Sequence, residues 1–187
     1  MKFSNGLVNN SLILATCADI VYALEEEGAN FGNTKEFVGY YVDDLHLHEM
    51  DLDKEELMVR NYYGPKYDQK LEDEYFHYES LRYQLLHEVK AIKYFHNQDV
   101  ENRKIIIFSN DCISMIQYIK RGPFSIMMVH MRSSDVKGLL PIDLLYLCKI
   151  FKDMNETYGP DVKESYLQVS IGSAHYYIEG ERPNEIN

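Results

Sequence analysis

Three apolar segments in the second half of the chain constrain the fold most, because each has the composition of a β-strand. They read RKIIIFS, CISMIQYIK and FSIMMVHMR, and Arg121, Gly122 and Pro123 separate the last two. Gly and Pro between two such segments are typical of a hairpin turn, so we expect these strands to pair. A further strand is predicted in SYLQVSIGSAHYY. The chain is therefore expected to build a sheet.

Helices are predicted around these strands from caps and helical spacing of apolar residues. Gly28 is a stop for the first helix. The apolar face of the second is expected from Phe37, Val38, Tyr41, Val42 and Leu45. Gly64 and the following proline indicate a loop before the longest helix. The predicted helices cover residues 10–28, 34–50, about 70–97 and 142–154, the last beginning after Pro141.

Length and composition predict a single α/β (α+β) domain over residues 1–187, with a mixed sheet packed by helices on one face. The longest apolar runs are too short to cross a bilayer, and no secretory leader is evident. Three widely spaced cysteines fit reduced thiols in the cytoplasm. The formal net charge of −11 disfavours binding to a nucleic-acid polymer or an anionic membrane.

Polar residues follow the third strand, where the sequence reads Arg132, Ser133, Ser134, Asp135. A guanidinium group, hydroxyls and backbone donors beside a helix start are suited to hold a phosphate, although an Arg–Asp pair at a strand end explains the same residues.

Cys112 begins the preceding strand, where a cysteine by itself is usually a small buried hydrophobe. If the two strands form a hairpin, Cys112 and Arg132 lie together at the end away from the turn. A cation there would lower the pKa of the thiol.

Several motifs in this half of the chain occur together in a known family. They are C-x4-Q at Cys112 and Gln117, MRSSDV-x4-P-x-D from Met131 to Asp143, and GSAHYY around His175. This pattern resembles the thymidylate synthases and, more closely, the phage-type deoxycytidylate hydroxymethylases. The resemblance implies a thymidylate synthase-like fold whose second sheet face lies in a dimer interface.

The resemblance also implies how a nucleotide is held. Cys112 would be the thiolate that adds to carbon 6 of a pyrimidine, which makes carbon 5 nucleophilic. Arg132 and Ser133 would bind the 5′-phosphate, and Arg103 and Lys104 would reach the phosphate bound by the other subunit of a homodimer.

Further roles are implied around the sugar and the base. His175 and Tyr177 would hydrogen-bond the 3′-hydroxyl, Glu49 would relay protons and order water, and Tyr63 would lie near the carbon 5 proton. Gln117 and Asp135 are additional candidates for substrate binding.

Asp143 indicates which base is read. The related synthases have Asn at this position and read uracil, whereas a carboxylate accepts a hydrogen bond from the cytosine amino group. A carboxylate facing uracil O4 would leave two acceptors opposed. The alternative is an exposed acid in the first turn of a helix that interacts with the helix dipole.

The predicted function is a nucleotide 5-hydroxymethylase that transfers a one-carbon unit from 5,10-methylenetetrahydrofolate to carbon 5 of dCMP or CMP, in the cytoplasm, or in the host cytoplasm if the protein is phage-encoded. The alternative is a nucleotide-binding relative without the folate lid, acting as a sensor or as a partner subunit.

Two histidines and an acid in HLHE raise the question of a metal ion. On the predicted helix, His46 and His48 would diverge, so no metal site is expected from His46, His48 and Glu49. The acidic segment EMDLDKEEL that overlaps this motif is interpreted as a solvated surface.

Overall fold

The computed structural model of the protein describes residues 3–96, 105–159 and 161–178. Its described residues form a mixed, open seven-stranded sheet with the strand order β1-β2-β7-β5-β4-β3, and β6 pairs with β7 outside this path. Pairing with β7 is parallel for β5 and β6, and the other pairs are antiparallel. The strands are β1 (Ala29–Phe31), β2 (Thr34–His46), β3 (Ile105–Phe108), β4 (Ile113–Arg121), β5 (Phe124–Met131), β6 (Ser134–Asp135) and β7 (Glu164–Tyr177).

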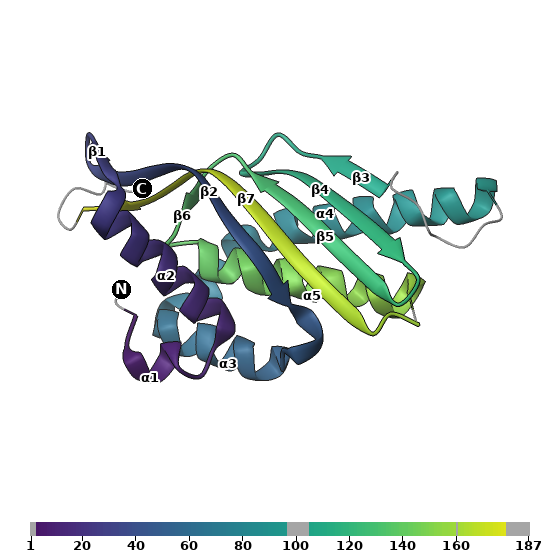
Figure 1. Cartoon of the computed structure of the whole chain (residues 1–187), viewed down its shortest axis with the longest axis horizontal. Coiled ribbons are helices and arrows are strands. Elements are labelled where there is room, and N and C mark those ends of the chain that lie inside the picture. Colours follow the sequence, from purple (N-terminus) through teal and green to yellow (C-terminus); the bar gives the residue numbers. More distant parts are fainter. Residues whose placement is uncertain (1–2, 97–104, 160, 179–187) are drawn as a thin grey trace.

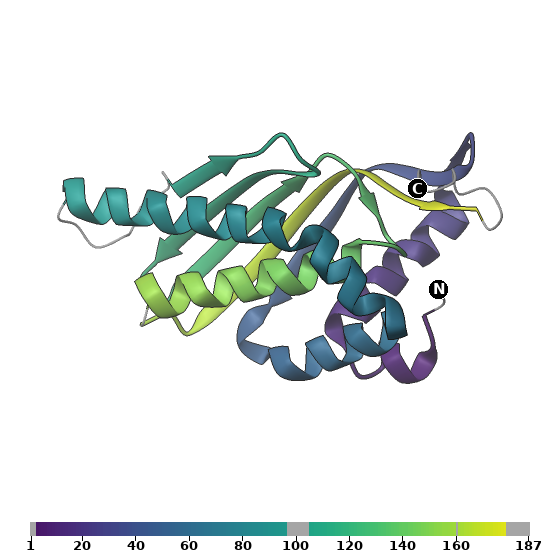
Figure 2. The same cartoon turned by 180° about the vertical axis from the view of Figure 1, so that it is seen from behind.

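Helices cover one face of this sheet. The two longest, α4 and α5, lie side by side behind the strands in Figure 1 and in front of them in the reverse view of Figure 2. The helix α2 packs against both β2 and α5, which places it on the same side. The helical segments are α1 (Asn5–Val8), α2 (Leu12–Glu27), η1 (Leu47–Glu49), α3 (Leu52–Tyr63), η2 (Gly64–Lys66), α4 (Tyr67–His96) and α5 (Leu140–Tyr158).

The predicted hairpin between the second and third apolar segments is confirmed. Its strands β4 and β5 pair from Ile113 opposite Met131 to Arg121 opposite Phe124. Gly122 in the turn has a φ of +52°, a conformation that L side chains rarely adopt. The helices predicted at 10–28, 70–97 and 142–154 are also present as α2, α4 and α5.

The helix predicted over residues 34–50 is wrong, because most of this segment is β2, which forms a hairpin with β1. Val42 and Leu45 are both buried although they are three residues apart, since an irregularity between them shifts the pairing with β7. A bulge of this kind places residues three apart on one face and so imitates helical spacing. The hairpin turns at Gly32, whose φ is +58°.

The acidic segment and the predicted loop after it are largely helical. Asp51 caps α3 through the backbone N–H of Lys54, and the helix continues to Tyr63. Within the segment interpreted as a solvated surface, Leu52 and Glu55 are buried. The Glu55 carboxylate accepts hydrogen bonds from Ser11 and from backbone N–H groups at the start of α2, so it joins two helices.

The two faces of the sheet differ in burial. Met127, Val129, Leu167 and Val169 face the helices and are at most 3% exposed. Residues between them in sequence, such as Met128, remain half-buried on the open face. No helix in the described ranges is long and apolar enough to cross a membrane.

Candidate functional site

Cys112 and Arg132 lie next to each other at the end of the β4–β5 hairpin that is away from the turn, as the sequence predicts. The backbone N–H of Arg132 donates to the carbonyl of Cys112 at 2.7 Å, and the Arg132 carbonyl accepts from Ser173 of β7 at 3.1 Å. Both side chains are exposed. A thiol and a guanidinium group are thus anchored by backbone bonds to the same end of the sheet.

The polar residues after Arg132 continue along β7. In β6, Ser134 pairs with Ala174 and Asp135 with His175, which brings the RSSD and GSAHYY motifs side by side. Ser133 is half-buried. The Ser134 hydroxyl is buried and is the one buried side-chain polar atom without a hydrogen-bond partner among the described residues.

Asp135 has a local structural role that the sequence did not predict. Its Oδ1 accepts hydrogen bonds from the backbone N–H groups of Lys137 and Gly138, at 3.2 and 3.0 Å. The bonds hold the turn that leads from β6 into α5. Asp135 therefore fixes the chain between Arg132 and Asp143, with one carboxylate oxygen already occupied.

Asp143 is a buried acid in the first turn of α5, with 6% of the residue exposed. Burial raises its pKa from 3.8 to about 7, and the negative charge of Glu74 adds to this, while a hydrogen bond from Tyr78 acts in the opposite direction. The Tyr78 hydroxyl donates to Asp143 Oδ1 at 2.6 Å. The interpretation of Asp143 as an exposed first-turn acid is thus wrong.

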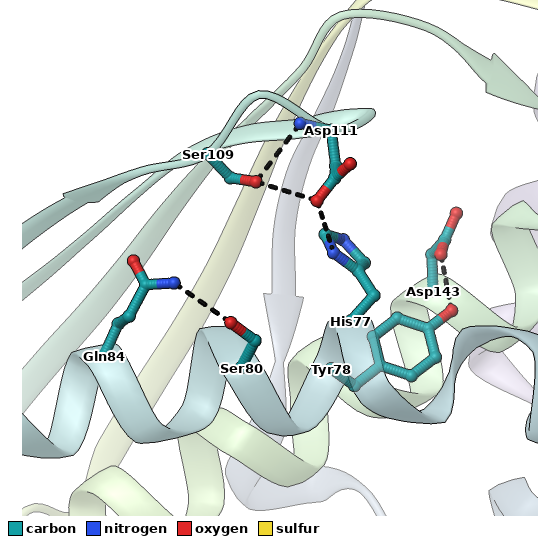
Figure 3. A network of polar contacts seen from close by, with 7 residues as sticks. All are labelled: His77, Tyr78, Ser80, Gln84, Ser109, Asp111 and Asp143. Carbon is teal, nitrogen blue, oxygen red and sulfur yellow. Dashed lines mark hydrogen bonds and ion pairs between the residues drawn. The ribbon is translucent and has the colours of Figure 1, made fainter.

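The helix α4, which carries Tyr78, also contacts the turn just before Cys112. His77, beside Tyr78 in α4, has its Nδ1 3.0 Å from Asp111 Oδ2. The Ser109 hydroxyl donates to the Asp111 carboxylate and accepts from the Asp111 backbone N–H. These bonds stabilise the turn before Cys112, and the His77 contact attaches this turn to α4. Figure 3 shows that His77 and Tyr78 point from α4 toward Asp111 and Asp143, respectively. The helix α4 therefore connects the cysteine turn with the buried acid.

Tyr63 and His175 lie close to these elements. The buried Tyr63 hydroxyl donates to the carbonyl of Gly138 at 3.1 Å, and burial raises the pKa of this phenol well above its usual value. His175 is half-buried, and its ring packs edge-on against Tyr177, with ring centroids 5.7 Å apart. Tyr63 thus anchors the loop before α5 through its hydrogen bond to Gly138.

Two predicted site residues lie elsewhere. Gln117 lies between the buried residues Ile116 and Tyr118 of β4, so its side chain projects to the open sheet face, five residues beyond Cys112. Glu49 follows the end of β2 that pairs with Tyr166, whereas Cys112 is level with the opposite end of β7. The fold does not bring either residue to Cys112.

Arg103 and Lys104, predicted to bind phosphate, lie outside the described residues.

Sequence reasoning missed His77, Tyr78 and Asp111. Their contacts join segments far apart in the chain, since Tyr78 and Asp143 are 65 positions apart. No local pattern indicates such a contact. The one available signal is that His77 and Tyr78 are adjacent on a helix, so one turn presents two polar side chains.

Cys112 and Arg132 are neighbours at one end of the sheet, and α4 contacts both the turn before Cys112 and the buried acid Asp143. A thiol can add to an electron-poor carbon, a guanidinium group can bind an anion, and a buried carboxyl can select a polar ligand group. No protein-family model matches the chain, and no curated protein matches it in sequence.

Proposed function

We propose that the chain is a pyrimidine nucleotide 5-hydroxymethylase that acts on dCMP or CMP. The observation that carries the proposal is that Cys112 and Arg132 are neighbours at one end of the sheet, while α4 contacts both the turn before Cys112 and Asp143. Cys112 directly precedes β4, Arg132 directly follows β5 and Asp143 lies in α5. They are the residues that the resemblance to the deoxycytidylate hydroxymethylases assigns to the reaction, the phosphate and the base.

The proposed reaction begins at Cys112. Its thiolate adds to carbon 6 of the cytosine ring, and the electron pair of the 5,6 double bond makes carbon 5 a nucleophile. Carbon 5 would then attack the methylene carbon of 5,10-methylenetetrahydrofolate as the bond from that carbon to one folate nitrogen breaks. After carbon 5 loses its proton, the bond to the second nitrogen would break and release tetrahydrofolate, water would add to the transferred carbon to give the hydroxymethyl group, and the thiolate would be expelled from carbon 6 as the 5,6 double bond returns. The exposure of Cys112 supports this role, because Cys17 and Cys148 are fully buried.

Phosphate binding is assigned to Arg132 and Ser133. The Arg132 backbone is held by bonds to both neighbouring strands, so its guanidinium group extends from a fixed point next to Cys112. Charge-assisted bonds from such a group to a phosphate are stronger than neutral ones. His175, which lies across from Asp135 on β7, is assigned to the sugar.

Base recognition is assigned to Asp143. Tyr78 donates to Oδ1, so Oδ2 remains as the acceptor for the 4-amino group of cytosine. The Tyr78 bond fixes the orientation of the carboxyl group. Uracil has a carbonyl at this position, which places acceptor against acceptor in a desolvated site.

The one-carbon donor is proposed to be 5,10-methylenetetrahydrofolate, which supplies a carbon at the oxidation level of formaldehyde. Its flat pterin ring needs an aromatic or apolar surface. Phe76, next to His77 on α4, has 81% of its surface exposed and offers such a ring. A folate-binding role for Phe76 is therefore included in the proposal.

The fold is proposed to be thymidylate synthase-like, and the assembly a twofold homodimer with the sheets back to back. The half-buried and exposed apolar residues of the open face support this assembly, because described helices cover only the other face. Ile119, Ile126 and Met128 provide the apolar centre, and Phe108 at the edge is 71% exposed.

A binding experiment tests the nucleotide site. The dissociation constant of dCMP is measured by calorimetry for the parent protein, for Arg132→Ala and for Arg121→Ala, which removes an exposed arginine at the other end of β4. Arg132→Ala should weaken binding at least tenfold and Arg121→Ala should leave it unchanged. Equal effects of the two substitutions would contradict the proposed phosphate site.

Binding without catalysis would favour a second function. If dCMP binds through Arg132 but carbon 5 never loses its proton when the folate is present, the chain is better described as a nucleotide-binding relative.

A further inference from the structure

A cluster of possible metal ligands lies at the far end of β2, away from Cys112. It consists of His46, the last residue of β2, and His48 and Glu49 in the short helix η1. One ligand atom from each of the three side chains lies within 4.8 Å of the other two. The sequence argument against a metal assumed a helix here, and that helix is absent.

The backbone explains why the two imidazoles converge. His46 is the last residue of β2 and has an extended backbone, whereas His48 lies in the short 3-10 helix that follows, so the chain bends between the two histidines. Leu47, between the histidines, is buried and anchors this turn. The ring centroids of His46 and His48 are 5.6 Å apart, and His48 Nε2 lies 3.6 Å from Glu49 Oε1.

One neighbour orients the half-buried member of the cluster. The His46 ring packs edge-on against Tyr166 of β7, with centroids 4.8 Å apart. The Tyr166 hydroxyl in turn donates to Glu164. His46 is thus held by packing, while His48 and Glu49 are exposed enough to move onto an ion.

We propose that His46, His48 and Glu49 form a binding site for a divalent transition metal, and zinc fits best. Two imidazoles and one carboxylate are a ligand set that zinc takes in proteins, with bonds of about 2.0–2.2 Å. Tetrahedral ligands at these lengths are about 3.3–3.6 Å apart. The His48–Glu49 separation already has this value, and rotation of exposed side chains closes the remainder. The fourth position is open to water.

The ion would link the end of β2 to the turn that leads into α3. The site is independent of the proposed nucleotide site, because β2 reaches it only at the end that pairs with Tyr166. Metal binding therefore stabilises this corner of the fold and takes no part in the chemistry at Cys112.

The test is zinc titration of the full chain by calorimetry, with the metal content of the dialysed protein measured in parallel. All proteins carry Cys112→Ser, because an exposed thiol is a competing zinc ligand. One zinc ion per chain is expected to bind with a dissociation constant in the micromolar range or below. His46→Gln and His48→Gln should each weaken binding by about tenfold or more.

His87→Gln is the matched control, because His87 is exposed on α4 and lies outside the cluster. It should bind zinc as the parent does. Circular dichroism without metal establishes that each variant is folded, and visible absorption of bound Co²⁺ reports the ligands directly. Absence of binding to the parent, or binding that His46→Gln and His48→Gln leave unchanged, overturns the proposal.

Discussion

The Tyr78 hydroxyl donates a 2.6 Å hydrogen bond to the buried carboxyl group of Asp143, across 65 residues of sequence. The bond joins α4 to the first turn of α5. It lowers the cost of ionising Asp143, but burial has the larger effect and raises the pKa of this acid to about 7. Asp143 is therefore a group that titrates near neutral pH in the position that we propose selects the base.

This pKa predicts how stability changes with pH. Between about pH 4 and pH 7 the folded state keeps the Asp143 proton while the unfolded chain loses it, so stability falls as pH rises and is constant above pH 7. Asp143→Asn removes this loss. As the pH rises from 4.5 to 8, the free energy of unfolding of the variant should increase by about 3 kcal/mol relative to that of the parent.

Urea unfolding of both proteins at the two pH values measures the difference. Other titrating groups are common to both proteins and cancel. A stability difference that does not change with pH would show that Asp143 is ionised in the folded protein throughout.

The same substitution should change base preference. An amide at position 143 donates a hydrogen bond to uracil O4, so the ratio of dUMP to dCMP affinity should rise by tenfold or more in Asp143→Asn, or about 1.4 kcal/mol. Dissociation constants for both nucleotides, measured by calorimetry, give this ratio. Glu156→Gln, an exposed substitution on the same helix, is the control and should leave it unchanged. An unaltered ratio in Asp143→Asn would mean that cytosine is read by another group.

The homodimer is tested on the open sheet face. Ile126→Asp introduces a charge where the proposed subunits meet, so it should convert a dimer into a monomer in sedimentation velocity. Leu57→Asp is the control, because it also replaces an apolar side chain with a carboxylate but lies on α3, away from the proposed sheet contact. Leu57 is 52% exposed, and the Leu57→Asp protein should remain a dimer. A parent protein that sediments as a monomer at micromolar concentration is incompatible with this assembly.

Glu55 should contribute strongly to stability. Its buried carboxylate accepts bonds from the Ser11 hydroxyl and from the N–H groups of Leu12 and Ile13, so truncation leaves several buried donors unpaired. Glu55→Ala is expected to cost about 2–4 kcal/mol in urea unfolding at pH 7. Asp53→Ala, an exposed change in the same helix, should cost less than 1 kcal/mol, as is usual for a surface substitution. Similar costs for both would mean that water replaces the Glu55 contacts.

The sequence predicted the elements whose signals are local. Residues around Gly122 predicted a hairpin, and the hairpin implied that Cys112 and Arg132 are neighbours. The error at 34–50 arose because a bulge between Val42 and Leu45 gave a strand the spacing of a helix. Because a helix was predicted here, the side chains of His46 and His48 were expected to diverge, whereas their ring centroids are 5.6 Å apart.

The candidate site was predictable only in part, because some of its residues lie in sequence motifs and others are brought there by tertiary packing. Cys112, Arg132 and Asp143 lie in short motifs, so sequence order was sufficient to find them. The contacts of His77 and Tyr78 depend on how α4 packs against α5 and the β3–β4 turn, and tertiary packing leaves no local signature. Glu49 was displaced for the same reason, since its position depends on the register of β2 with β7.

The most direct measurement of the central claim is the release of tritium from carbon 5 of labelled dCMP in the presence of methylenetetrahydrofolate. The parent protein should release tritium, Cys112→Ser should release none, and Cys148→Ala, which alters a buried thiol, should retain activity. Nucleotide binding is measured on the same samples. If the parent binds dCMP but releases no tritium from dCMP or CMP, or if Cys112→Ser remains active, the chain is not a hydroxymethylase that uses Cys112.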